Sequence, residues 1–160
     1  MTKTSKPLPY REGDWISVPL RDGGFALGLI ARAPKRGKVL LGYFFGPRLS
    51  KEPTISDTGA YSPAKAVLVA KFGDYSLYHQ EWAILGRRAD WDPTVWPMPL
   101  FSRIDEDGKA LKVEYSEDDP SLCVREIPCS VQEAMSYSED RMLGSHVLAH
   151  RLNALLGFRP

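Results

Sequence analysis

The sequence has few cysteines and no long hydrophobic run. Its two cysteines, Cys123 and Cys129, are too few for a disulfide framework, and their spacing fits neither a zinc knuckle nor a redox C-x-x-C pair. Apolar runs such as 39–41 and 43–45 are cut short by glycine, so the sequence predicts no membrane span. Because no apolar block follows the polar first residues, we expect neither a secretory signal nor a lipid anchor, and we expect a cytoplasmic protein.

Patterns that carry catalysis are missing as well. His146 and His150 stand four positions apart, but Val147 occupies the place where an H-E-x-x-H motif requires glutamate, and no third ligand is evident. The glycines of the first 42 residues lead into expected strands, so they form no phosphate-binding loop before a helix. No serine lies in a G-x-S-x-G elbow. We therefore expect a non-enzymatic protein with no catalytic, cofactor-binding or metal-binding residues.

Short strands separated by turn residues fill the first part of the chain. Residues 14–20 are rich in β-branched and aromatic side chains, and Ile16, Val18 and Leu20 share one face at a period of two. The Asp-Gly-Gly sequence at 22–24 supplies the positive φ angles of a hairpin turn into 25–31. Residues 34–37 predict a second turn into a third strand, 39–45, which we expect Gly46 and Pro47 to close. Glycines within these strands favour a strongly bent sheet.

The middle of the chain is less regular. Residues 64–72 are open to two interpretations, because Ser62-Pro63 can begin a helix whereas Val67, Val69 and Phe72 favour a buried strand; we prefer the strand. Residues 82–86 resemble another short strand. A hairpin is expected between 100–104 and 110–115, followed by a last strand over 122–127.

The carboxyl-terminal part changes to a helical period. Ser130 and Glu133 form a capping-box pattern, and Leu148, Leu152 and Leu155 share one helical face. The expected helix runs over about 131–156, either continuous or broken at 136–138. We therefore predict an α+β, mostly β fold: a strongly bent antiparallel sheet, or a small partly open barrel, with a C-terminal helical segment. The expected organisation is a loose N-terminal lead over 1–12 and a single domain over 13–160, which is β-rich over 13–127 and helical over 130–157.

Charge is distributed unevenly behind a net charge of +1. Residues 1–51 contain ten basic and three acidic side chains, whereas 105–119 contain seven acidic side chains and two lysines. A basic patch is compatible with nucleic acid, and an acidic cluster on two turns can steer a basic protein partner. Turn tips are also often charged only for solubility.

Two tryptophans, Trp91 and Trp96, lie in a segment rich in proline. Their large rings either fill the core or lie on the surface as anchors for a partner, and we prefer the core.

Several stretches of the chain resemble the immunity protein 26 family of bacterial polymorphic toxin systems. The resemblance covers roughly residues 10–105 and is carried by GDWISVPL at 13–20, GGFALGLIAR at 23–32, LGYFFGP at 41–47, FGD at 72–74, WAILG at 82–86 and WPMPLF at 96–101. It implies a mostly β protein, encoded beside a toxin, that binds the toxin and neutralises it. It supplies no catalytic residue.

Our hypothesis is a non-enzymatic antitoxin that occludes the active site of a cognate toxin. The predicted contact residues are the acidic turns and the two tryptophans: Asp105, Glu106, Asp107, Glu117, Asp118, Asp119, Trp91 and Trp96. The alternative is a small β-barrel that binds nucleic acid through Lys35, Arg36, Lys38 and Arg48. The sequence leaves the oligomeric state open.

Overall fold

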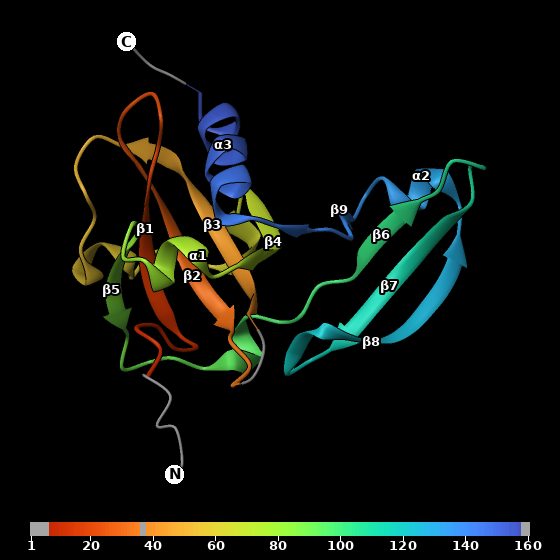
Figure 1. Ribbon diagram of the computed structural model, residues 1–160, viewed down its shortest axis with the longest axis horizontal. Coiled ribbons are helices and arrows are strands. Elements are labelled where there is room, and N and C mark those ends of the chain that lie inside the picture. Colours follow the sequence, from red (N-terminus) through yellow and green to blue (C-terminus); the bar gives the residue numbers. More distant parts are fainter. Residues whose placement is uncertain (1–6, 36–37, 158–160) are drawn as a thin grey trace.

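Two β-sheets make up most of the structure, a computed structural model that describes residues 7–35 and 38–157 (Figure 1). Sheet A has six strands in the order β10-β4-β3-β2-β1-β5, and sheet B has four in the order β8-β7-β6-β9. The elements of sheet A are β1 (Asp14–Pro19), β2 (Phe25–Arg32), β3 (Val39–Leu49), β4 (Leu68–Gly73), β5 (Ala83–Arg87) and β10 (Met142–Leu143). Those of sheet B are β6 (Phe101–Ile104), β7 (Ala110–Ser116), β8 (Asp119–Cys129) and β9 (Ser138–Glu139).

Short helices connect and cover these strands. They are η1 (Ile55–Thr58), η2 (Pro63–Lys65), α1 (Tyr75–Tyr78), η3 (Pro93–Val95), α2 (Val131–Ala134) and α3 (Ser145–Leu155). Neither sheet closes on itself, so the mostly β fold with a C-terminal helix is confirmed in its open form. No helix of the described residues is long and apolar enough to cross a membrane.

The first hairpin forms where turn residues predicted it. Gly23 and Gly24 both have positive φ angles, and the amide of Leu20 donates to the carbonyl of Gly24 at 2.9 Å. The third strand differs from expectation at its end, because β3 continues through Gly46 and Pro47 to Leu49 and pairs there with Phe25. Of the predicted second turn, residues 36 and 37 lie outside the described residues.

The ambiguous segment 64–72 is mainly a strand, as preferred. Pro63–Lys65 forms a single 3₁₀ turn, and β4 then pairs antiparallel with β3 along its whole length. The β-branched and aromatic side chains of this segment therefore decide its structure over the Ser-Pro helix start.

Sheet A is buried on both faces. Neighbouring residues such as Phe44 and Phe45 belong to different core clusters, because successive side chains of a strand point to opposite faces. One cluster lies under α3 and includes Leu148 and Leu152; the other includes Phe101 and joins sheet A to sheet B. Burial on both faces explains why strands such as LLGYFF are continuously apolar rather than alternating.

Glycine within β3 has a packing reason. A Cβ atom at Gly42 would lie 2.6 Å from the ring of Phe44 and 2.7 Å from that of Phe72. The two rings pack edge to face, with centroids 5.5 Å apart, over the space that the missing side chain leaves.

The prediction of a helical segment over 130–157 is wrong between 135 and 144. That stretch leaves α2 and contributes β9, which pairs parallel with β6, and β10, which pairs parallel with β4. It therefore connects sheet B to sheet A as extended chain, and its two pairings make both sheets mixed. In α3, Leu155 is 54% exposed, and Leu156 packs against the core in its place.

The expected lead divides into two parts. Residues 1–6 lie outside the described residues, whereas Tyr10 is buried in the cluster under α3 and donates its hydroxyl proton to Asp74 Oδ2 at 2.6 Å.

Candidate functional site

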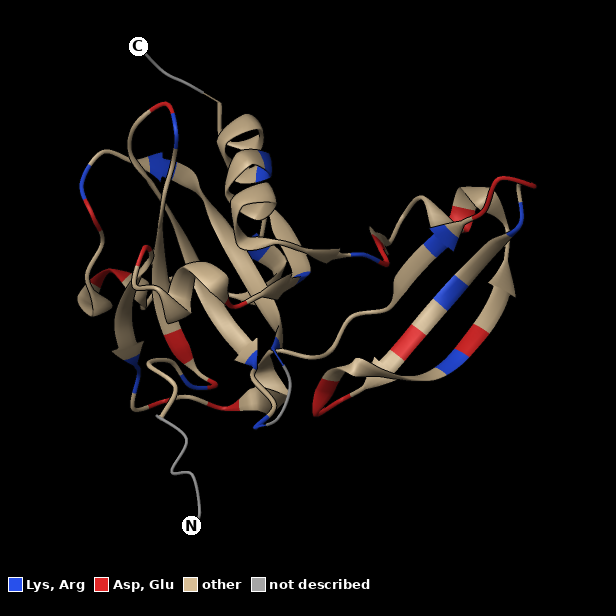
Figure 2. Ribbon diagram, in the orientation of Figure 1, with Lys and Arg blue, Asp and Glu red and all other residues tan. Residues whose placement is uncertain are grey.

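Sheet B carries the acidic turns that the sequence identified, at its two opposite ends (Figure 2). The β6–β7 turn holds Asp105, Glu106 and Asp107, and the two-residue β7–β8 turn holds Glu117 and Asp118. The seven residues of β7 separate the two turns by about 20 Å. The structure therefore places the acidic residues on one sheet without gathering them into one cluster.

Within the β6–β7 turn, only one carboxylate has a structural role. Asp105 Oδ1 accepts hydrogen bonds from the amides of Asp107 and Lys109, at 3.1 and 2.9 Å, and so shapes the turn. Glu106 and Asp107 are exposed, and their carboxylates make no hydrogen bond or ion pair with any residue that the structure describes. They are free to face a partner.

At the β7–β8 turn and the start of β8, the three acidic side chains also differ in their contacts. Asp119 Oδ1 accepts from the amide and the hydroxyl of Ser121, at 2.9 and 2.6 Å. The exposed carboxylate of Asp118 makes no contact of this kind within residues 7–35 and 38–157. Glu117 is tied to sheet A through Arg32.

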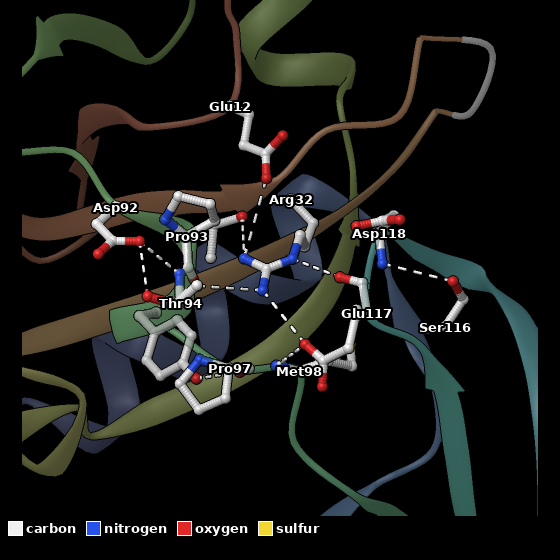
Figure 3. A network of polar contacts seen from close by, with 12 residues as sticks. Glu12, Arg32, Asp92, Pro93, Thr94, Pro97, Met98, Ser116, Glu117 and Asp118 are labelled. Carbon is white, nitrogen blue, oxygen red and sulfur yellow. Dashed lines mark hydrogen bonds and ion pairs between the residues drawn. The ribbon is translucent and has the colours of Figure 1, made fainter.

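Arg32 lies at the end of β2 and is 4% exposed (Figure 3). Its guanidinium donates to the carbonyls of Ala31, Pro93 and Glu117, and it pairs with the Glu117 carboxylate at 3.4 Å and with Glu12 at 3.9 Å. This buried cation fastens the β7–β8 turn to sheet A. Arg32 is one of the ten basic side chains of residues 1–51, from which the sequence predicted a basic surface patch.

Replacing Arg32 with methionine is expected to lower the free energy of unfolding by about 2 kcal/mol, because the carbonyls that it satisfies lose a charged donor. Replacing Glu117 with alanine is expected to cost under about 1 kcal/mol, since its carboxylate is largely exposed and the backbone contact remains. Urea unfolding of both variants checks this order. Equal losses would contradict it.

A second buried ionic cluster joins the sheets at Asp140, just after β9. Its carboxylate accepts from Lys71 Nζ of β4 and from the Tyr115 hydroxyl at 2.6 Å, and it pairs with Arg103 at 3.0 Å. The side chains of Lys71 and Asp140 are 7% and 6% exposed. The Lys71 ammonium also lies over the rings of Tyr115 and Phe101, 3.8 and 5.1 Å from their centroids.

Stability is expected to fall in acid because of Asp140. Burial raises its pKa, but the hydrogen bonds from Lys71 and Tyr115, together with the positive charges of Lys71 and Arg103, hold the pKa below its usual value. A carboxyl whose folded pKa is lowered stabilises the fold fully above its unfolded pKa of about 4, and this contribution is lost as pH falls through the folded pKa. The unfolding free energy of Asp140→Asn should therefore depend less on pH below about 4. If the unfolding free energies of the native protein and of Asp140→Asn changed equally with pH below about 4, this role of Asp140 would be contradicted.

The two tryptophans have different positions. Trp96 is 7% exposed and packs edge to face on Trp15 and Tyr43, with centroids 5.9 and 5.1 Å apart, so its ring fills the core as preferred. Trp91 is half-buried and lines a small hollow with Arg88 and Tyr61.

The basic residues of the alternative hypothesis do not form one patch. Lys35 and Lys38 lie before β3, whereas Arg48 lies near its far end, about 30 Å away along the strand. Arg48 also donates to the carbonyls of Gly23, Asn153 and Gly157. Arg36 lies outside the described residues. Nothing in this arrangement supports a nucleic-acid surface.

The histidines and cysteines form no cluster with one another among the described residues. His146 Nε2 is 2.9 Å from Glu81 Oε1, and Cys123 and Cys129 are free thiols on β8. Among the residues described, no group of three or more His, Cys, Asp or Glu side chains is placed to hold a metal ion.

Sequence reasoning missed two exposed apolar features. One is β8, the open edge of sheet B, where Leu122 and Val124 are 54% and 56% exposed. The other lies on α1 and α3, where Tyr75, Tyr78 and Val147 are exposed beside His146. The first could have been found, because the last strand of a meander lies at a sheet edge.

Comparison with known proteins identifies one relationship. The family model described as immunity protein 26 matches residues 11–112, which include all strands of sheet A except β10, together with β6 and the start of β7. The β7–β8 turn, β8 and α3 lie outside the matched residues. No curated protein and no solved structure matches the chain.

Proposed function

The chain belongs to the immunity protein 26 family, and from that membership we propose that it binds a cognate toxin of a bacterial polymorphic toxin system and neutralises it in the cytoplasm. The family match over 11–112 is the observation that carries this proposal. Neutralisation is non-enzymatic in this proposal: the chain covers the toxin's active site and makes or breaks no bond.

The projecting sheet B supports the choice of contact surface. Residues 101–129 hold eight acidic and four basic side chains, although the whole chain has a net charge of +1. The free carboxylates of Glu106, Asp107 and Asp118 lie at its two ends and face solvent. A negative surface of this kind attracts a cationic toxin and raises the rate of encounter. Of the two tryptophans, we choose Trp91 as the contact residue in this proposal, because its ring is the more exposed.

Co-expression tests the proposal directly in cells. The protein encoded by the reading frame beside this chain's gene is induced with the chain, with an empty vector, or with an Arg32→Met/Asp140→Ala variant that we expect to be poorly folded. Growth should be rescued only by the intact chain. Continued cell death in its presence would reject the proposal.

A further inference from the structure

The outer edge of β8 has an unused row of backbone hydrogen-bonding groups. β8 pairs with β7 on one side, and no other described strand pairs with it on the other side. Residues 121–126 are exposed throughout, in the longest such run within any strand of the structure. An edge of this length is normally covered or blocked, since it is a template for pairing with another chain.

Two features limit where pairing can occur. Pro120 and Pro128 lack amide protons, so an added strand can form a ladder only with the seven residues between them. The pairing of β8 with β7 is interrupted twice: Val124 bulges opposite Glu114 and Tyr115, and residues 120–122 have no partner between Tyr115 and Ser116. Both irregularities twist the edge locally. We call residues 121–127 the pairing window. Because this window is short and twisted, it disfavours pairing with flat strands in general and favours a partner strand with the same twist.

The charges around the window select the chemistry of the partner. Arg125 is paired with Glu114 and Arg103 with Glu126, so the cations beside the edge are neutralised within sheet B. The free carboxylate of Asp118 lies before the start of β8, and the acidic β6–β7 turn lies beyond its end (Figure 2). The window therefore has apolar side chains along it, Leu122 and Val124, and negative charge at both ends.

We propose that this edge receives an extended segment of the toxin as a fifth strand of sheet B, with apolar residues that cover Leu122 and Val124 and with lysine or arginine at its two ends. The proposal rests on the proposed function and adds where and how the toxin is held. Backbone hydrogen bonds supply affinity in this mode, and the flanking charges and apolar contacts supply selectivity.

Hydrogen exchange on the complex tests the edge directly. The probe is the protein of the adjacent reading frame, inactivated by substitution and mixed with the full chain. The amides of residues 121–127 that face away from β7 should gain hydrogen-bond partners, and deuterium uptake at those amides should slow at least tenfold. If deuterium uptake slowed only around Tyr75 and Tyr78, this binding site would be wrong, although the proposed neutralisation of the toxin would still stand. Absence of any complex would overturn both.

A matched pair of substitutions gives an independent test. Val124→Lys places a charge on the edge, whereas Val147→Lys places the same charge at a similarly exposed valine, 48% exposed, in the rival apolar surface on α3. Val124→Lys should raise the dissociation rate of the complex at least tenfold, and Val147→Lys should change it less than twofold. The reverse result would overturn the proposal.

The same edge could instead pair with a second copy of the chain. Sedimentation of the chain alone at increasing concentration distinguishes the two occupants. We expect a monomer with unprotected residues 121–127. A dimer that protects these residues, and that Val124→Lys dissociates, would show that the edge belongs to self-association and overturn the toxin assignment.

Discussion

Asp140→Ala is expected to lower the free energy of unfolding by about 3–5 kcal/mol, the largest effect of any single polar substitution in this protein. Lys71 would remain buried without its carboxylate partner, and the Tyr115 hydroxyl would lose its acceptor. Because Lys71 lies on sheet A and Tyr115 on sheet B, the loss should also loosen the contact between the sheets. Urea unfolding of the purified variant measures the change.

Two further variants separate the ion pair from general damage. Glu139 is the exposed neighbour of Asp140, and its carboxylate makes no contact with the described part of the chain, so Glu139→Ala should stay within about 0.5 kcal/mol of the native protein. Lys71→Met with Asp140→Leu removes both charges together and should recover most of the loss. A double variant as unstable as the sum of the single ones would show that the pair is not coupled.

Reversing Asp107 and Asp118 to lysine is expected to lower the association rate with the inactivated adjacent-frame protein about tenfold or more at low salt. Both carboxylates are exposed and free of contacts within residues 7–35 and 38–157, so stability should change little. The effect should shrink as added salt screens the charges, and the dissociation rate should change less than the association rate. Stopped-flow or surface binding kinetics measure both rates.

Glu52→Lys is the control for this charge reversal, and it is compared with the single Asp118→Lys variant, which changes the net charge by the same amount. Glu52 is exposed on the loop that follows β3, a strand of sheet A, and is not part of sheet B. Its reversal should leave the association rate within about twofold, because steering depends on charge near the contact surface. Equal slowing by both variants would indicate a general effect of net charge, and no slowing by either would remove the acidic turns from the interface.

Much of the sheet architecture could be predicted because its signals are local. Asp22-Gly23-Gly24 determines a turn by itself, and the acidic turn at 105–108 does the same between β6 and β7. The stretch 135–144 was mispredicted because its structure comes from β6 and β4, which are distant in sequence. Half of the predicted capping box formed: the Glu133 amide donates to Ser130 Oγ, but the Glu133 carboxylate accepts from Lys112 Nζ and leaves the box incomplete. The helix that begins there has only four residues.

The candidate site was less predictable than the fold. Sequence clustering identified the acidic residues, but their separation depends on the length of β7. Arg32 lies in a basic segment, so the sequence predicts an exposed cation. It is buried because it donates to the carbonyls of Pro93 and Glu117, which are distant in sequence. The open edge of β8 could have been inferred from its place as the last strand of the meander, but the exposure of Leu122 and Val124 along it depends on how sheet B packs against sheet A.

Direct titration of the purified chain against the inactivated adjacent-frame protein tests the central claim most directly. We expect a one-to-one complex with a Kd of about 10⁻⁷ M or tighter, as in other specific protein complexes, and loss of toxin activity when the active toxin is bound. A toxin that stays active with the chain in excess, or that binds no chain at micromolar concentration, would contradict the account.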